Sequence, residues 1–200
     1  MSKDLFAHKA ESYDENKGSV DNVDNIANSI IKSVDLKKSM HIMDFGSGTG
    51  LLLERIAPLV GKITAVDTSA SMTKQLAEKR SRLNCKLEMM EVDLEKTEID
   101  QTFDGIISSM TMHHIRDIDA MFAKFYRMLK PGGFIAISDL DKEDGSFHSE
   151  DTGIFHFGFE RESIARAATR VGFKDVEVTT ASVVHKPQGD FPVFLLKASR

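Results

Sequence analysis

Cysteine is almost absent from this sequence, because Cys85 is the only one among 200 residues. A lone thiol excludes a disulfide within the chain, and its default interpretation is a buried, inert side chain. Long hydrophobic runs are missing too, and no stretch approaches the ~20 apolar residues that span a bilayer. The first residues, MSKDLFAHKAESYDE, lack the basic end and apolar centre of a signal peptide. The sequence therefore predicts a cytoplasmic protein that needs no membrane.

Positively charged residues are fewer than negatively charged ones. The chain has 26 Lys and Arg against 31 Asp and Glu, which gives a formal net charge of -5. Because contacts to phosphates need clustered Lys and Arg, this balance argues against a nucleic-acid partner. Apolar residues make up 41% of the chain, enough for one domain with a sizeable core.

Short apolar runs alternate with helical patterns through most of the chain. The runs HIMDF, KITAVD, CKLEMMEVD, FDGIISS and GFIAIS predict strands, most of them buried on both faces. Between them, GLLLERIAPL, SASMTKQLAEKRSRL and DIDAMFAKFYRML predict helices. This alternation indicates an α/β fold, a doubly wound and mostly parallel sheet with helices on both faces.

The two ends of the chain differ from this pattern. RESIARAATRVGF predicts a helix that ends at Gly172, and the β-rich runs DVEVTTASVVHK and FPVFLLKAS after it predict an antiparallel hairpin. Near the start, SVDNVDNIANSIIKSV predicts an amphipathic helix capped by Ser19 that docks on the rest of the fold.

The segment MDFGSGTG, residues 43–50, occupies the first strand-to-helix turn, where open α/β sheets usually bind ligands. Gly46 and Gly48 permit a tight turn and close approach of a ligand, and free N–H groups at the next helix favour a negative group. A dinucleotide fingerprint starting at Gly46 requires glycine at position 51, where this chain has Leu51. Asp44 would repel a pyrophosphate but can receive a ligand ammonium, so a zwitterionic amino acid moiety suits the turn better.

Two further strand ends carry carboxylates. Asp67 is placed to accept hydrogen bonds from both hydroxyls of a ribose, although it is also suited to an ordinary strand-end cap. Asp93 can accept from an exocyclic adenine amine or simply be a solvated loop acid. Met72 can lie against an adenine or belong to the core.

The series MDFGSGTG, AVDTSASM, EVDLEK, FDGIISSMTMHHIRD and LKPGGFIAISDLD resembles the class I S-adenosylmethionine-dependent methyltransferases in order and spacing. It is most similar to the small single-domain group that includes quinone-biosynthesis methyltransferases. The resemblance covers roughly residues 40 to 180. It implies a Rossmann-like, seven-stranded sheet whose final strand is inserted antiparallel. It also implies one domain over residues 1–200, with an N-terminal helical lid (1–37) and a Rossmann-like core (38–200).

The resemblance also implies roles for individual residues. The cofactor would be S-adenosyl-L-methionine and the product S-adenosyl-L-homocysteine. Tyr13, in AESYDENKGS, would lie near the methyl group as part of the lid. The methionine part of the cofactor would be surrounded by Asp44, Gly46, Ser47 and Gly48, and the ribose would be held by Asp67 and Thr68. The adenine would be flanked by Asp93 and Leu94, and Ser109 and Met110 would lie under the sulfonium end.

Methyl transfer from a sulfonium is an in-line displacement, so alignment and exclusion of water matter most. A general base is needed only if the acceptor must lose a proton. His113 and His114 are the candidate catalytic bases, because they follow the fourth strand and histidine titrates near neutrality. The alternative is that the pair opens the following helix, with one imidazole bonded to backbone.

The stretch from Asp139 to Glu162 is long for a connection between a strand and a helix. We interpret it as a loop that covers the acceptor, with His148 and His156 lining the substrate site. Asp139, Asp141, His148 and His156 offer metal-ligand chemistry, but no tight ligand spacing supports a site, so we expect no metal.

The leading functional hypothesis is an enzyme that methylates a small-molecule acceptor. The alternatives are methylation of a protein side chain and a non-catalytic, cofactor-binding partner subunit of a methyltransferase. A dinucleotide-dependent oxidoreductase is disfavoured by Leu51 and by the lack of a Tyr-x-x-x-Lys pair. The sequence leaves the acceptor and the oligomeric state undetermined.

Overall fold

The computed structural model describes residues 4–148, 150 and 152–200. One seven-stranded sheet with the strand order β3-β2-β1-β4-β5-β7-β6 organises this part of the chain. Strands β1 to β5 pair in parallel, whereas β7 is antiparallel to both of its neighbours. The predicted fold class, a doubly wound sheet with an antiparallel C-terminal hairpin strand, is confirmed. The strands are β1 (His41–Phe45), β2 (Lys62–Asp67), β3 (Lys86–Glu91), β4 (Phe103–Ser109), β5 (Leu129–Leu140), β6 (Lys174–Lys186) and β7 (Gly189–Ser199).

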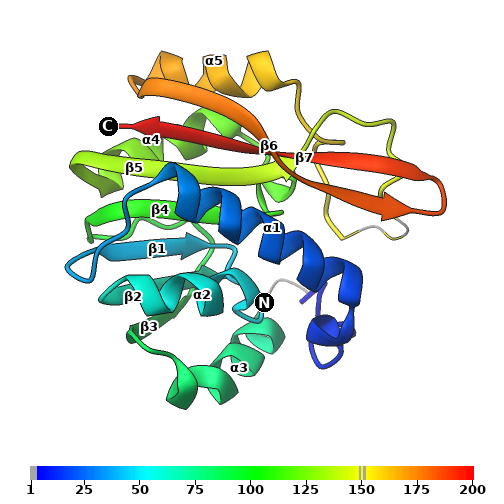
Figure 1. Cartoon of the computed structure of the whole chain (residues 1–200), viewed down its shortest axis with the longest axis horizontal. Helices are drawn as coiled ribbons and strands as arrows, with labels where there is room; N and C mark the ends of the chain where they lie inside the picture. The colour runs from blue at the N-terminus through cyan, green and yellow to red at the C-terminus, as the bar shows by residue number, and fades with distance from the viewer. Residues whose placement is uncertain (1–3, 149, 151) are drawn as a thin grey trace.

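Helices cover both faces of the sheet (Figure 1). One hydrophobic cluster lies between the sheet and α1, α2 and α3, and the other between the sheet and α4 and α5. The α-helices are α1 (Lys17–Ser33), α2 (Leu51–Ile56), α3 (Ala70–Lys79), α4 (Ile118–Met128) and α5 (Arg161–Val171), and the short 3₁₀ turns are η1 (Tyr13–Glu15), η2 (Ala57–Leu59), η3 (Arg80–Arg82) and η4 (Met112–His114).

Helix α1 differs from the predicted helix at its start. The N-cap is Asn16, whose side chain accepts a hydrogen bond from the backbone N–H of Ser19, so the predicted cap lies inside the first turn. Val23, Ile26 and Ile30 of α1 are buried in the core. Helix α1 is therefore part of the core, and the division into a lid and a core at residue 37 stays a prediction.

Strand β5 starts earlier than the sequence indicates. Leu129 already pairs with Phe103 of β4, and an irregularity separates this pair from the regular register that begins at Gly105 and Phe134. The Pro-Gly-Gly segment therefore lies inside the strand rather than before it.

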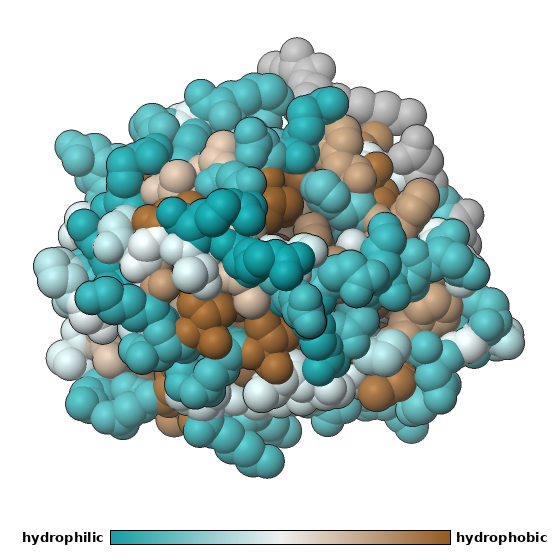
Figure 2. Space-filling model, turned by 90° about the horizontal axis from the view of Figure 1, so that it is seen from above, coloured by the Kyte–Doolittle hydropathy of each residue, from teal (hydrophilic) through white to brown (hydrophobic). Residues whose placement is uncertain are grey.

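The parallel strands all end at the right of Figure 1, where the N-terminal segment and the segment after β5 also lie. The fold thus gathers three otherwise distant parts of the chain at one edge of the sheet. Figure 2, which views the molecule from the side of α5, shows hydrophobic residues in small groups among hydrophilic ones. None of the described helices is long and apolar enough to cross a membrane.

Candidate active site

Two adjoining cavities lie at the carboxyl ends of the parallel strands. The first, which we call the β3 cavity, has a volume of about 530 Å³ and is lined by residues that follow β2 and β3. The second, the β6 cavity, has a volume of about 430 Å³ and lies beside α1 and the end of β6. Both cavities are lined by Phe6, Tyr13, Gly46, Gly48, Ser109, Met110, His114 and Thr152. The shared residues make the two cavities halves of one site.

The turn after β1 shows two different reasons for glycine. Gly46 has a φ of 70°, and a Cβ there would lie 2.2 Å from Thr111 Oγ1, so its missing side chain makes room for Thr111. Gly48 has a φ of 54°, and a Cβ there would meet nothing within 4 Å. Since Gly48 lines both cavities, the space above it is where a ligand can approach the backbone.

Asp44, at the end of β1, is only 1% exposed. Its Oδ2 is buried and has no hydrogen-bond partner among the described residues. Burial, aided by the negative charge of Asp67, raises the pKa of Asp44 to about 8. A cationic group entering the β6 cavity would give this carboxyl the partner it lacks, which fits the ammonium of an amino acid moiety.

Asp67 ends β2 and its carboxylate holds two walls of the site. Oδ2 accepts from the backbone N–H of Gly48 (2.7 Å), and Oδ1 accepts from that of Ser69 (2.8 Å). Burial raises the pKa of Asp67, and these hydrogen bonds oppose the rise. Each oxygen retains a lone pair, so Asp67 can still accept from a diol in the β3 cavity.

The remaining residues predicted around the adenosine also line the β3 cavity, namely Thr68, Met72, Asp93 and Leu94. Asp93 accepts from the backbone N–H of Glu95 and from Lys96 Nζ, at 2.9 and 2.6 Å. Met72 and Leu94 are 4% and 2% exposed. Each therefore contributes to the core and to the cavity wall together, so the two interpretations of Met72 do not exclude each other.

Ser109 ends β4 and Met110 follows it, at the junction of the two cavities. Met110 has a φ of 55°, a left-handed conformation that is uncommon for residues other than glycine. Its backbone N–H donates to the carbonyl of Ser138 (2.9 Å), which holds it there. Ser109 Oγ is buried without a partner among the described residues. Backbone strain and an unpaired hydroxyl together are typical of a ligand site.

His113 lies in η4 and is 3% exposed. Its Nδ1 is 2.7 Å from Oδ1 of Asp139, which is 0% exposed, and its backbone N–H donates to Asp139 Oδ2. Burial alone would raise the pKa of Asp139, but its contacts with His113 and with backbone N–H groups lower it. A carboxylate on Nδ1 fixes the tautomer of an imidazole, which leaves Nε2 to act. Since His113 lines the β6 cavity, this pair has the arrangement of an oriented base.

The other three predicted histidines differ from one another. His114 lines both cavities, its Nδ1 lies 3.2 Å from the Gly153 carbonyl oxygen, and burial and His113 lower its pKa to about 4. His148 lines the β6 cavity, and burial followed by the neighbouring histidines lowers its pKa to about 4. His156 lines neither cavity, because its Nε2 is bonded to the carbonyl of Ile115.

The N-terminal segment is a larger part of the site than the sequence indicates. Asp4 accepts from the backbone N–H and the hydroxyl of Ser71 (3.0 and 2.6 Å) and from the hydroxyl of Ser69 (2.8 Å), so it lies over the start of α3. Phe6 packs edge-to-face on His114, with ring centroids 5.5 Å apart. We call residues 4–16 the strap, because they cross both cavities and contribute Tyr13 to each.

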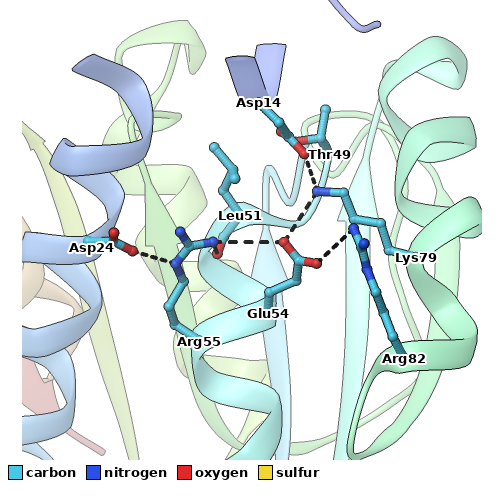
Figure 3. Close-up of polar contacts among 8 residues, drawn as sticks. All are labelled: Asp14, Asp24, Thr49, Leu51, Glu54, Arg55, Lys79 and Arg82. Carbon is cyan, nitrogen blue, oxygen red and sulfur yellow. Dashed lines mark hydrogen bonds and ion pairs between the residues drawn. The ribbon is translucent and has the colours of Figure 1, made fainter. Parts of the chain in front are cut away.

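An ion-pair network fastens the strap to α2 and α3 (Figure 3). Asp14 accepts from the hydroxyl of Thr49 (2.6 Å) and pairs with Lys79. Lys79, whose side chain is 8% exposed, also pairs with Glu54 (3.3 Å). The network continues from Glu54 to Arg82 and Arg55, and from Arg55 to Asp24 of α1. Asp14 is thus the strap's own contact with this network, one residue from Tyr13.

The structure therefore brings together, around the two cavities, every predicted site residue except His156. Across residues 4–148, 150 and 152–200, no three His, Cys, Asp or Glu side chains are grouped so that they could hold a metal ion.

Comparison with known proteins supports a methyltransferase. Residues 42–133 match the family described as "Methyltransferase domain". The chain is 28% identical to an uncharacterised methyltransferase of Schizosaccharomyces pombe, over 94% of this chain and 70% of that protein. It is 34% identical to phosphoethanolamine N-methyltransferase 3 of Arabidopsis thaliana, over 54% of this chain and 23% of that one. The methyltransferase solved in complex with the Haloferax volcanii activator Trm112 has the same fold, with a TM-score of 0.78, 17% identity and coverage of 100% and 99% of the two chains.

The matched methyltransferase domain, the methyltransferase relatives and the shared fold support a class I S-adenosylmethionine-dependent methyltransferase. Its cofactor is S-adenosylmethionine, and the site fits this molecule on observations of its own. The unpaired Asp44 Oδ2 matches an ammonium, the open space above Gly48 admits a ligand against the backbone, and Asp67 faces the β3 cavity with acceptor capacity to spare. The matched segment of the Arabidopsis enzyme is a small part of that protein, so the match carries no acceptor with it.

Proposed function

We propose that this methyltransferase transfers the methyl group to a small-molecule acceptor that occupies the part of the β6 cavity left free by the amino acid moiety of the cofactor. The main support is the continuity of the two cavities through Ser109 and Met110, which leaves the β6 cavity beside the expected position of the sulfonium. The β6 cavity, at about 430 Å³, is within the ~300–1,000 Å³ of small-molecule sites, and the acceptor shares it with the amino acid part of the cofactor at Asp44 and Ser47. The strap and the segment after β5 both contribute to its lining, as expected where water must be excluded.

Within this proposal the cofactor-binding residues keep the roles that the resemblance implies. Asp44 receives the ammonium, Gly46, Ser47 and Gly48 surround the amino acid part, and Asp67 with Thr68 holds the ribose. The adenine is enclosed by Met72, Asp93 and Leu94. Bound S-adenosylmethionine supplies an electrophilic methyl group on a sulfonium, so the protein's own residues need to position, desolvate and deprotonate the acceptor.

His113 is the residue that we assign to deprotonation. Asp139 holds its Nδ1–H, so Nε2 is the nitrogen available to remove a proton from an acidic acceptor such as a phenol, an enol or an ammonium. His114 is bonded to backbone and neutral near pH 7, which suits a wall of the site better than a base. Tyr13 closes the site from the strap, and a cytoplasmic location stays a prediction.

The test is methyl transfer to a metabolite extract with S-adenosylmethionine labelled in its methyl group. We expect label in a small-molecule fraction, lost when S-adenosylmethionine binding is lost in Gly48→Val. In His113→Asn we expect transfer to fall ~10²-fold or more with cofactor affinity unchanged, the usual contribution of a positioned general base. Label found only in protein would favour a protein side chain as acceptor. Cofactor binding without transfer to either fraction would favour a non-catalytic partner subunit.

A further inference from the structure

The end of the β6 cavity farthest along the hairpin is built around Lys186, the last residue of β6. Its Nζ donates a hydrogen bond to the backbone carbonyl of Phe147 and lies 3.8 Å from the centroid of the Phe147 ring. Phe147 is fixed in turn by edge-to-face contacts with His148 and Phe191, at 4.8 and 5.2 Å between centroids. The ammonium is therefore held in one place on the cavity wall.

Positive charge exceeds negative charge here, because the Glu143 carboxylate, the acid that acts on Lys186, raises its pKa by less than burial and Lys9 lower it. Within the part of the chain that the structure describes, Lys186 makes no ion pair. Lys9 lines the same cavity, and its charge, after the larger effect of burial, lowers the pKa of Lys186. The carboxylate of Glu150 is already shared between Lys9 (2.7 Å) and His8 (3.1 Å). Two ammonium groups that repel each other across a cavity favour an anion between them.

Polar atoms without partners face the same space. His148 Nε2 and Asn22 Oδ1 are buried and have no hydrogen-bond partner among the described residues, and both residues line the β6 cavity. Asn22 Oδ1 is an acceptor and does not bind an anion itself, whereas His148 Nε2 can donate to one. Buried polar groups are normally paired, which indicates that a ligand completes them.

The first turn of α1 supports the same conclusion. Gly18 and Ser19 line the cavity, and α1 has 17 residues, so its N-terminal partial positive charge is directed at the same space. Asn16 uses its side chain to cap Ser19, which leaves other N–H groups of the turn without a helical partner. The helix end adds to the field of Lys9 and Lys186.

We propose that this end of the β6 cavity binds an anionic group, a carboxylate or a phosphate, of the methyl acceptor. Lys186 is the charged partner of that group, and His148 Nε2 and the first turn of α1 donate hydrogen bonds to it. The anionic group thereby anchors the acceptor so that its reacting atom lies toward Ser109 and Met110. This inference rests on the proposed function, because it concerns the acceptor of that same site.

A binding experiment tests the anion site without any turnover. Inorganic phosphate and, separately, acetate are titrated into the protein saturated with S-adenosylhomocysteine, and the imidazole resonances of His148 are followed by NMR. We expect a saturable shift with at least one anion. Lys186→Met should weaken the binding of that anion by about tenfold to a hundredfold, which corresponds to the loss of one hydrogen bond to a charged group. Lys186→Arg should retain the binding.

Lys74→Met is the matched control, because Lys74 is exposed on α3 and lines neither cavity. It should leave the anion titration unchanged, and all variants should bind S-adenosylhomocysteine within about twofold of the wild type. A shift that persists equally in Lys186→Met, or no saturable shift with either anion, overturns the proposal. Loss of S-adenosylhomocysteine binding in the wild type would instead contradict the proposed function.

The labelled product gives a second, independent readout. At neutral pH the methylated product from the metabolite extract should be retained on an anion exchanger, and its formation should fall about tenfold or more in Lys186→Met but not in Lys74→Met. A neutral or cationic product overturns the anion site while leaving methyl transfer established. The two proposals therefore fail in distinguishable ways.

Discussion

The carboxylate of Asp67 accepts a hydrogen bond from the backbone N–H of Gly48, with 2.7 Å between N and Oδ2. The contact joins the end of β2 to the glycine turn after β1, and the other oxygen joins it to Ser69 at the start of α3. One side chain thus shapes the turn and faces the β3 cavity. Its two tasks, organising backbone and accepting from a ligand, are expected to be lost together.

Asp67→Ala should weaken S-adenosylhomocysteine binding by about 1.5–3 kcal/mol, the range for hydrogen bonds to a charged group. The variant should stay folded, because Asp67 is at the end of a strand and removal of a carboxylate whose pKa is raised by burial relieves a desolvation cost. Calorimetry gives the affinity, and circular dichroism confirms the fold. An affinity within twofold of the wild type in a folded variant would remove Asp67 from the cofactor site.

Substitution of Gly46 and substitution of Gly48 should impair the protein for different reasons. In Gly46→Ala the new Cβ would overlap Thr111, so the loss appears in stability, by about 1–3 kcal/mol for overpacking in addition to the strained φ. In Gly48→Ala the Cβ enters open space, so stability falls by only ~1 kcal/mol from backbone strain while cofactor binding is largely lost. Thermal unfolding and calorimetry on both variants separate the two. Equal loss of stability, or full binding by Gly48→Ala, contradicts this assignment.

The order of the elements and the glycine turn were predictable because they depend on local patterns. Apolar runs and the helix end at Gly172 act over a few residues, and the structure has them where the sequence indicates. The predicted cap at Ser19 was wrong, because Asn16 offers its side chain to the same helix three residues earlier. Competing caps so close together cannot be ranked from residue types alone.

The contacts that complete the site were not predictable, because they join residues far apart in the chain. Asp139 lies 26 positions from His113, and Asp4 lies 67 positions from Ser71, so no spacing rule links either pair. The position of Lys186 depends on where the C-terminal hairpin, formed by the last two strands of the sequence, joins the sheet. In the sequence, a lysine at the end of such a strand cannot be distinguished from a solvated surface lysine, because the order of the strands in the sheet determines that it lies beside the cavity.

Asp44 should make the ligand-free protein less stable as pH rises. Its pKa is about 8 when folded and ~3.9 when unfolded, so between these values the unfolded state binds fewer protons and stability falls with pH. Below pH ~4 both states are protonated and there is no such loss. Asp44→Asn cannot ionise, so its stability relative to the wild type should increase by on the order of a few kcal/mol from pH 5 to pH 8.5. Urea unfolding at both pH values measures this, and parallel stability curves for the two proteins would sink the idea.

The strap offers the last test, through two aspartates that contact the same ion-pair network (Figure 3). Asp14 belongs to the strap and pairs with Lys79, whereas Asp24 belongs to α1, which Val23, Ile26 and Ile30 already anchor in the core. Both carboxylates are partly exposed, so neither substitution should cost more than ~1 kcal/mol of stability.

Asp14→Ala should nevertheless weaken S-adenosylhomocysteine binding by about threefold to tenfold, or ~0.7–1.4 kcal/mol, because the strap that carries Tyr13 over both cavities loses its attachment to Thr49 and Lys79. Asp24→Ala should bind like the wild type. Hydrogen exchange in residues 4–16 should quicken in Asp14→Ala alone, since closure of a segment that is held by few contacts is the step that the ion pair supports. If both variants bind alike and exchange alike, the network serves only to join α1, α2 and α3, and the strap closes by its contacts with Ser69, Ser71 and His114 instead.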